Sequence, residues 1–280
     1  MFNADYLNRR DKLALEAHQH TKEMENQYSD EIEECIKNSI IWSADDQLLD
    51  ITLEQYGIVK HADLSAYHNA EKKVVSFKIL QNTTDEAIMK SYEEHIAILN
   101  FASYKNPGGG FLSGCTAQEE WLCHYSYLFN ILSKLSKYYE WNNAHLNKGM
   151  YTNRAVYTPN VRFFDSKGNS RLADVITCAA PNKSLLFRYN AFSEEENNLV
   201  LENRINFIKL IAYLSNPKTE NIILGAWGCG VFRQDPVLVC NLFTLAFLNS
   251  TYNTVIYAIP DNKTYKIFLN TFNDNKALKK

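Results

Sequence analysis

Short apolar runs along this chain alternate with longer stretches in which apolar residues recur at helical spacing. The runs predict strands buried on both faces, and the clearest are residues 96–101, 174–179 and 221–224. Amphipathic stretches follow them and predict helices over residues 118–139, 193–214 and 235–249. Strands that alternate with helices in this way predict an α/β fold with a mixed, mostly parallel sheet covered on both faces.

Weaker patterns complete the expected element list. Shorter strands are predicted at residues 51–53, 74–80, 155–158, 161–164 and 254–259, and further helices at 83–94 and 262–272. Residues 140–153 have no periodicity, which predicts a loop.

The first 40 residues are highly charged and have a sparse helical pattern. Apolar positions such as Leu13, Met24 and Ile32 can line one face of a helix spanning residues 4–40. We expect residues 1–70 to form a helical extension packed on a main domain at residues 71–280. This packing role is favoured over a separate binding module.

Composition and charge narrow the functional classes. The net charge of −3 argues against nucleic-acid binding driven by charge neutralisation. No apolar run approaches the roughly 20 residues of a membrane helix, and the N-terminus lacks the apolar segment of a signal peptide. We therefore expect a cytoplasmic protein. The 6 cysteines and 7 histidines show no ligand spacing, so no metal site is predicted.

A run of three glycines follows the apolar run at residues 96–101. Gly108 to Gly110 favour unusual backbone angles or the close approach of another molecule. After seven intervening residues, Gln118, Glu119 and Glu120 open a predicted helix. Ligand sites of α/β sheets commonly lie at the carboxyl ends of strands. Two acidic residues in a first helical turn can also simply complement the helix dipole.

A second glycine-bearing loop follows the apolar run at residues 221–224. Its sequence, G-A-W-G-C-G-V-F at residues 225–232, matches neither a Walker loop nor a dinucleotide fingerprint. Backbone N–H groups of two such loops, each between a strand and a helix, can surround one anionic ligand. A tight structural turn is the alternative interpretation of this motif.

The two motifs together resemble those of bacterial-type poly(ADP-ribose) glycohydrolases of the macrodomain superfamily. The resemblance implies a three-layer α/β/α macrodomain-like sandwich that needs no cofactor and binds ADP-ribose or an ADP-ribosylated macromolecule. It also implies that Glu120 is the catalytic acid/base and that Glu119 holds ribose hydroxyls. The second loop would wrap the diphosphate. The implied ligand-binding residues are Asn106, Gly108, Gly109, Gly110, Gln118, Gly228, Cys229, Gly230, Val231 and Phe232.

Three activities are compatible with this resemblance. The first is hydrolysis of the ribose–ribose O-glycosidic bond of poly(ADP-ribose). The second is removal of mono-ADP-ribose from protein, including arginine-linked modification, or from nucleic acid. The third is binding of ADP-ribose without turnover, and Glu120 weighs against it because binding alone does not need an acid/base. Gln118 has a second interpretation as a residue that caps the helix or locks the loop.

Overall fold

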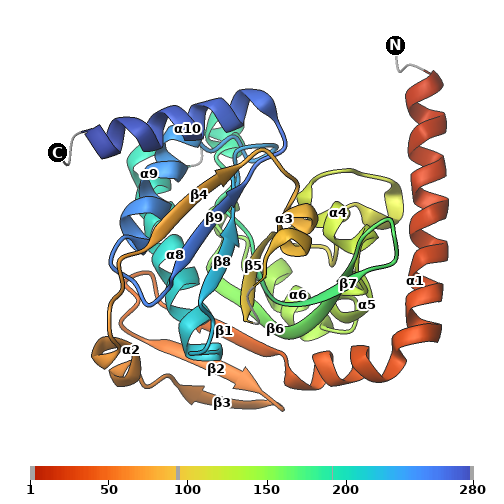
Figure 1. Ribbon diagram of the computed structural model, residues 1–280, viewed down its shortest axis with the longest axis horizontal. Coiled ribbons are helices and arrows are strands. Elements are labelled where there is room, and N and C mark those ends of the chain that lie inside the picture. Colours follow the sequence, from red (N-terminus) through yellow and green to blue (C-terminus); the bar gives the residue numbers. More distant parts are fainter. Residues whose placement is uncertain (1–3, 93–94, 191, 278–280) are drawn as a thin grey trace.

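The structure is a computed structural model that describes residues 4–92, 95–190 and 192–277 (Figure 1). Its strands are β1 (Ile40–Ala44), β2 (Ile51–Gln55), β3 (Ile58–His61), β4 (Ser76–Leu80), β5 (Ile96–Phe101), β6 (Asn153–Phe164), β7 (Ser170–Cys178), β8 (Asn221–Leu224) and β9 (Thr254–Ala258). Its α-helices are α1 (Ala4–Asn38), α2 (Ser65–Asn69), α3 (Thr84–Lys90), α4 (Gln118–His124), α5 (Leu128–Leu132), α6 (Ser136–Ala144), α7 (Ser184–Tyr189), α8 (Glu194–Ser215), α9 (Pro236–Phe247) and α10 (Asn262–Ala277). Two 3₁₀ turns are η1 (Phe111–Ser113) and η2 (Asn147–Gly149).

The strands in the described part of the chain form one nine-stranded mixed sheet, in the order β3-β2-β1-β6-β7-β5-β8-β9-β4. The pairs β7–β5, β5–β8, β8–β9 and β9–β4 are parallel, and the pairs from β3 to β7 are antiparallel. The predicted α/β fold is therefore confirmed. Parallel strands direct their carboxyl ends to one edge of the sheet, which brings their following loops together.

Side chains alternate between two apolar cores, one on each face of the sheet. In β5, Ala97 and Leu99 join one core, whereas Ile96 and Ile98 join the other. Helices α8, α9 and α10 complete the first core, and α1 together with α3 to α6 completes the second (Figure 1). Burial on both faces explains why the central strands are continuous apolar runs in the sequence.

The single helix expected over residues 118–139 is wrong, because the segment forms α4, α5 and the start of α6. Phe164 donates its backbone N–H to the carbonyl of Tyr125, at 2.8 Å, and Ser126 forms an isolated bridge with Phe163. These contacts with β6 take the place of the next backbone hydrogen bonds of the helix, so α4 ends at His124. Helix α6 then continues to Ala144, into the segment predicted to be a loop.

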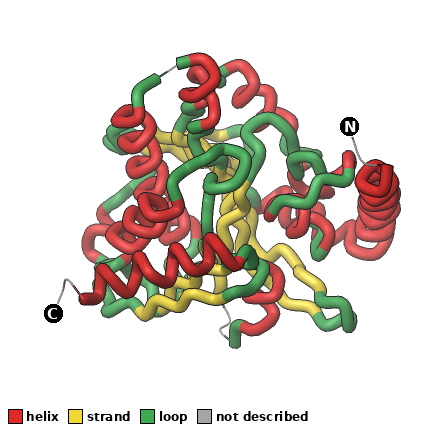
Figure 2. The backbone as a smooth tube through the Cα atoms, turned by 90° about the horizontal axis from the view of Figure 1, so that it is seen from above, coloured by secondary structure: helices red, strands yellow, loops and turns green. Residues whose placement is uncertain are grey.

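The expected helical extension at residues 1–70 contains three strands of the main sheet. Strand β1 pairs with β6, with Trp42 opposite Ala155, so residues 40–61 extend the sheet. The helical part is mainly α1, which bends at Tyr28 (φ −130°, ψ 25°) and runs along one side of the molecule (Figures 1 and 2). The strands expected on either side of Pro159 are one strand, β6, with an irregular register.

Two further observations bear on the chemistry. The six cysteines are free thiols. Among the described residues, no helix has the length and apolarity to cross a membrane.

The two faces of α8 allow a direct test of the core. Ile205 is fully buried, whereas Leu199 on the same helix is 59% exposed. Ile205→Ala should lower the free energy of unfolding by about 2–5 kcal/mol, through lost apolar transfer and the cavity left behind. Leu199→Ala should change it by less than about 1 kcal/mol. Urea unfolding measures both, and equal losses would contradict the assignment of these faces.

Candidate active site

The two glycine loops are neighbours at the carboxyl edge of the parallel strands. Strand β5 lies between β7 and β8, and it pairs in parallel with both. The first loop leaves β5 after Phe101, and the second leaves β8 at Gly225. A Cβ added to Gly225 would lie 3.0 Å from the ring of Phe101 and 2.6 Å from the carbonyl oxygen of Ala258. The structure thus brings together the two motifs predicted to share a ligand.

Left-handed glycines fold the first loop back on itself. Gly108 and Gly109 have φ of +63° and +60°, a conformation that most residues adopt at a cost. Gly109 donates its N–H to the carbonyl of Asn106, at 3.1 Å. Phe111 is buried after the turn and packs against Phe129, which anchors the loop. Asn106 is exposed on this loop.

Gln118 ties the end of β5 to the start of α4. Its Oε1 accepts the backbone N–H of Phe101 at 2.8 Å, and its Nε2 donates to the carbonyl of Leu99 at 2.9 Å. The same Nε2 also lies 3.1 Å from the hydroxyl of Thr84 on α3. Because protein groups occupy both ends of the amide, the structure favours the loop-locking interpretation of Gln118.

Glu119 is buried beneath the first loop, with only 3% of its surface exposed. Its Oε1 accepts from Asn100 Nδ2 at 3.2 Å, and its Oε2 accepts the N–H of Ser103 at 2.7 Å. Burial raises the pKa of Glu119 to about 8, and the neighbouring Glu120 adds to this effect. The hydrogen bonds from Ser103 and Asn100 oppose it. Asn100 is the one polar residue within β5, and this polarity is the signal in the sequence that could have indicated the contact.

Glu120 is also buried, but its two oxygens have different surroundings. Its Oε1 accepts the backbone N–H of Gly110 at 2.8 Å. Its Oε2 is buried and has no hydrogen-bond partner among the described residues. A Cβ added to Gly109 would lie 2.6 Å from Glu120 Oε1 and 2.9 Å from Glu119 Oε2. Both carboxylates therefore face the backbone of one glycine, and one oxygen of Glu120 is available for proton transfer.

The second loop is anchored by a buried side chain and is exposed to solvent at its tip. Trp227 is buried and donates its indole N–H to the carbonyl of Cys178, at 3.0 Å. Gly228 has φ +76°, and Gly230 has no atom within 4 Å of an added Cβ. Val231 is 81% exposed. The tip therefore presents its backbone to solvent at the same edge as the two carboxylates.

An aromatic stack joins the two loops through Tyr151, which lies in the segment predicted to be a loop. Tyr104 of the first loop stacks on Tyr151, with ring centroids 4.1 Å apart and planes 10° apart. Phe232 of the second loop packs against the same Tyr151, at 6.1 Å. Tyr151 has a left-handed backbone (φ +61°) and follows η2. The local sequence pattern did not indicate that Tyr151 would stack on Tyr104, because the two residues lie far apart along the chain.

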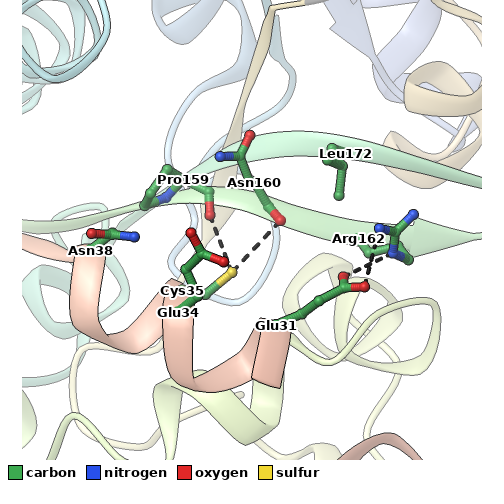
Figure 3. A pocket seen from close by; sticks show the side chains of 8 residues that line it. All are labelled: Glu31, Glu34, Cys35, Asn38, Pro159, Asn160, Arg162 and Leu172. Atoms are coloured by element: carbon green, nitrogen blue, oxygen red, sulfur yellow. Dashed lines mark hydrogen bonds and ion pairs between the residues drawn. The ribbon is translucent and has the colours of Figure 1, made fainter. Parts of the chain in front are cut away.

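A cavity of about 330 Å³ lies elsewhere, between the carboxyl-terminal part of α1 and strands β6 and β7 (Figure 3). Its lining includes Glu31, which pairs with Arg162 at 2.9 Å, and Cys35, whose thiol donates to backbone carbonyls. Burial raises the pKa of Cys35 to about 11, which makes a nucleophilic role unfavourable. This cavity contains none of the predicted site residues.

Comparisons with known proteins agree with this geometry. The sequence profile described as microbial-type PARG, catalytic domain, matches residues 11–166, which include α1 from its third turn onward and the whole first loop. The chain belongs to the microbial-type poly(ADP-ribose) glycohydrolase (PARG) family. No curated protein sequence matches it significantly.

Solved structures of bacterial PARGs share the fold. The PARG from Thermomonospora curvata is 24% identical, with a TM-score of 0.77, over 94% of this chain and 100% of that one. Two structures of the PARG from Deinococcus radiodurans in complex with ADP-ribose are also similar. One is 29% identical over 74% of this chain and 88% of the other, with a TM-score of 0.66. The other is 30% identical over 71% and 85%, with a TM-score of 0.63. The fold of this PARG family member is therefore shared with proteins of known structure.

The buried carboxylate of Glu119 predicts a specific dependence of stability on pH. Its pKa is about 8 in the folded state, against 4.5 for an unperturbed group. Between these values the folded state binds more protons than the unfolded state, so this group lowers stability as pH rises. Glu119→Gln removes the titration. The stability of this variant relative to wild type should therefore increase from about pH 5 to about pH 8.

Urea unfolding at several pH values measures this difference. Glu140→Gln, which changes an exposed glutamate on α6, is the matched control and should run parallel to wild type. A Glu119→Gln curve that also runs parallel to wild type would contradict the raised pKa.

Proposed function

We propose that this chain is a poly(ADP-ribose) glycohydrolase that hydrolyses the ribose–ribose O-glycosidic bond and releases ADP-ribose. The observation that carries the proposal is the pair of buried carboxylates facing Gly109, within a chain of the PARG family. Similar PARGs from D. radiodurans were solved in complex with ADP-ribose, which supports the ligand class.

The two loops suit the two halves of this ligand. The tip of the second loop, from Gly228 to Phe232, would hold the diphosphate through its backbone N–H groups. The first loop would receive the ribose that carries the scissile bond, because the backbone of Gly109 packs directly against both carboxylates. Glu119 would orient this ribose by accepting hydrogen bonds from its hydroxyls. Phe232 would pack against the sugars.

Glu120 would serve first as an acid and then as a base. In its protonated form, it gives its proton to the leaving ribose oxygen while the anomeric C–O bond breaks and positive charge develops on the sugar. The resulting carboxylate then accepts a proton from the water that attacks the anomeric carbon. One water is consumed, two hydroxyl groups form, and Glu120 regains its proton. The N–H of Gly110 holds Oε1 in place, which leaves Oε2 for these transfers.

Glu120→Gln tests the catalytic assignment. The amide keeps the shape of the side chain and removes its acid/base function, so ADP-ribose affinity should persist while turnover falls by roughly 10²–10⁴-fold. Release of free ADP-ribose from poly(ADP-ribose), with chelator present, measures turnover, and calorimetry measures affinity. Glu140→Gln should behave as wild type.

Each outcome of this experiment has a defined meaning. A Glu120→Gln enzyme as fast as wild type would overturn the assignment of Glu120. A wild-type protein that binds ADP-ribose but releases none from the polymer would overturn the polymer as substrate. Arginine-linked and other mono-ADP-ribosylated substrates would then be assayed in its place.

Gly109→Ala tests the close approach of the first loop. The added methyl would overlap both carboxylates, and a displacement of about 1 Å can reduce catalysis by roughly 10²-fold. Gly168→Ala is a matched control, because Gly168 also has positive φ (+84°) but has no atom within 4 Å of an added Cβ. The control should lose about 1 kcal/mol of stability and keep its activity. Equal losses of activity in both variants would contradict this interpretation, because backbone strain alone would then explain the loss in Gly109→Ala.

A further inference from the structure

The amino-terminal part of α1 lies directly against the turn that follows the three glycines. Arg10 donates from Nε to the carbonyl of Ser113, at 2.7 Å, and its Nη2 lies 3.7 Å from the sulfur of Cys115. Gly114 has φ +70°, and a Cβ added there would lie 2.1 Å from the carbonyl oxygen of Arg10. No side chain fits between α1 and this turn, so the two backbones are in contact (Figure 1).

Gly110 connects this turn to the catalytic carboxylate. Its carbonyl accepts the N–H groups of Ser113, at 2.9 Å, and Cys115, at 3.1 Å. Its own N–H donates to Glu120 Oε1, at 2.8 Å. A Cβ added to Gly110 would lie 2.5 Å from the sulfur of Cys115, so the two residues are closely packed. A shift of residues 113–115 would therefore move the only hydrogen-bond donor that the described structure provides to the carboxylate of Glu120.

We propose that Arg10 is a positioning residue for Glu120, acting through Ser113, Cys115 and Gly110. The guanidinium fixes the outer side of the turn, and the turn fixes the N–H that holds Oε1. Helix α1 is then a component of the active site, with a role beyond packing on the domain. This inference rests on the proposed acid/base function of Glu120.

The rest of α1 has attachments that do not depend on Arg10. His20 contacts the carbonyl of Ser126 at 2.8 Å, and Asn130 donates to the carbonyl of Thr21 at 2.9 Å. Further along, Glu31 pairs with Arg162. Removing the Arg10 side chain therefore leaves the helix docked, so its effect on catalysis can be separated from unfolding.

The expected signature is a reduced kcat with unchanged ligand affinity. Arg10→Ala should lower kcat roughly tenfold, because a misplaced acid/base is costly while its chemistry is intact. The Kd for ADP-ribose should stay within about twofold of the wild-type value. Neither the second loop nor the hydrogen bonds of Glu119 involve residues 113–115. Arg10→Lys retains one donor for the Ser113 carbonyl and should recover part of the lost kcat.

The experiment measures kcat on poly(ADP-ribose), Kd for ADP-ribose and thermal unfolding for wild type, Arg10→Ala and Arg10→Lys. Lys12→Ala is the matched control, because Lys12 is an exposed cation on the same helix that pairs only with the exposed Glu16 among the described residues. The expected order of kcat is wild type equal to Lys12→Ala, then Arg10→Lys, then Arg10→Ala.

Two results would overturn the inference. One is an Arg10→Ala kcat equal to that of wild type. The other is a parallel loss of kcat, ADP-ribose affinity and thermal stability, which would indicate a purely structural role. If wild type itself released no ADP-ribose, the proposed function would fail, and this outcome is distinguishable because it precedes any comparison of variants.

Discussion

The close approach of the Gly109 backbone to two buried carboxylates is the constraint on which the rest of the site depends. No side chain fits between this residue and Glu119 or Glu120, so the loop needs glycine and a left-handed turn at this point. A loop of this kind gains little stability from its own conformation, because glycine loses more entropy on ordering than other residues. The conformation of the loop must therefore be set by the elements that contact it, which are β5, α4 and α1.

The two adjacent glutamates differ because their partners differ. Glu119 is buried, and both of its oxygens accept hydrogen bonds from β5 and the residues just after it, which orients this carboxyl group. Glu120 is held through one oxygen by Gly110, and its other oxygen has no hydrogen-bond partner in the described part of the chain. Neighbours on a helix point in different directions, so one sequence motif can supply a carboxyl group held at both oxygens beside a carboxyl group held at one.

Local patterns predicted much of the fold and both glycine loops. The central strands are continuous apolar runs because each is buried on both faces, a property visible in a single segment. The break after α4 was not predictable in this way. It depends on backbone contacts of Tyr125 and Ser126 with β6, about 40 residues away along the chain. The stack of Tyr104 on Tyr151 was missed for the same reason. Helical spacing continues through residues 118–139, and only tertiary contacts interrupt it.

The first loop is also held by side chains from distant parts of the chain, one of which comes from α1. A loop that turns backbone groups towards a ligand has fewer of them left to bond with itself, so side chains from elsewhere must hold it. Gln118 supplies this at the β5 end, by bonding the strand backbone as another strand would. Arg10 supplies it at the far end, where the carbonyl of Ser113 faces outward from the turn. The contact spans 103 residues of sequence, so no local pattern could have indicated it. An arginine suits this position because its planar fork can donate to a carbonyl and contact a neighbouring sulfur at the same time.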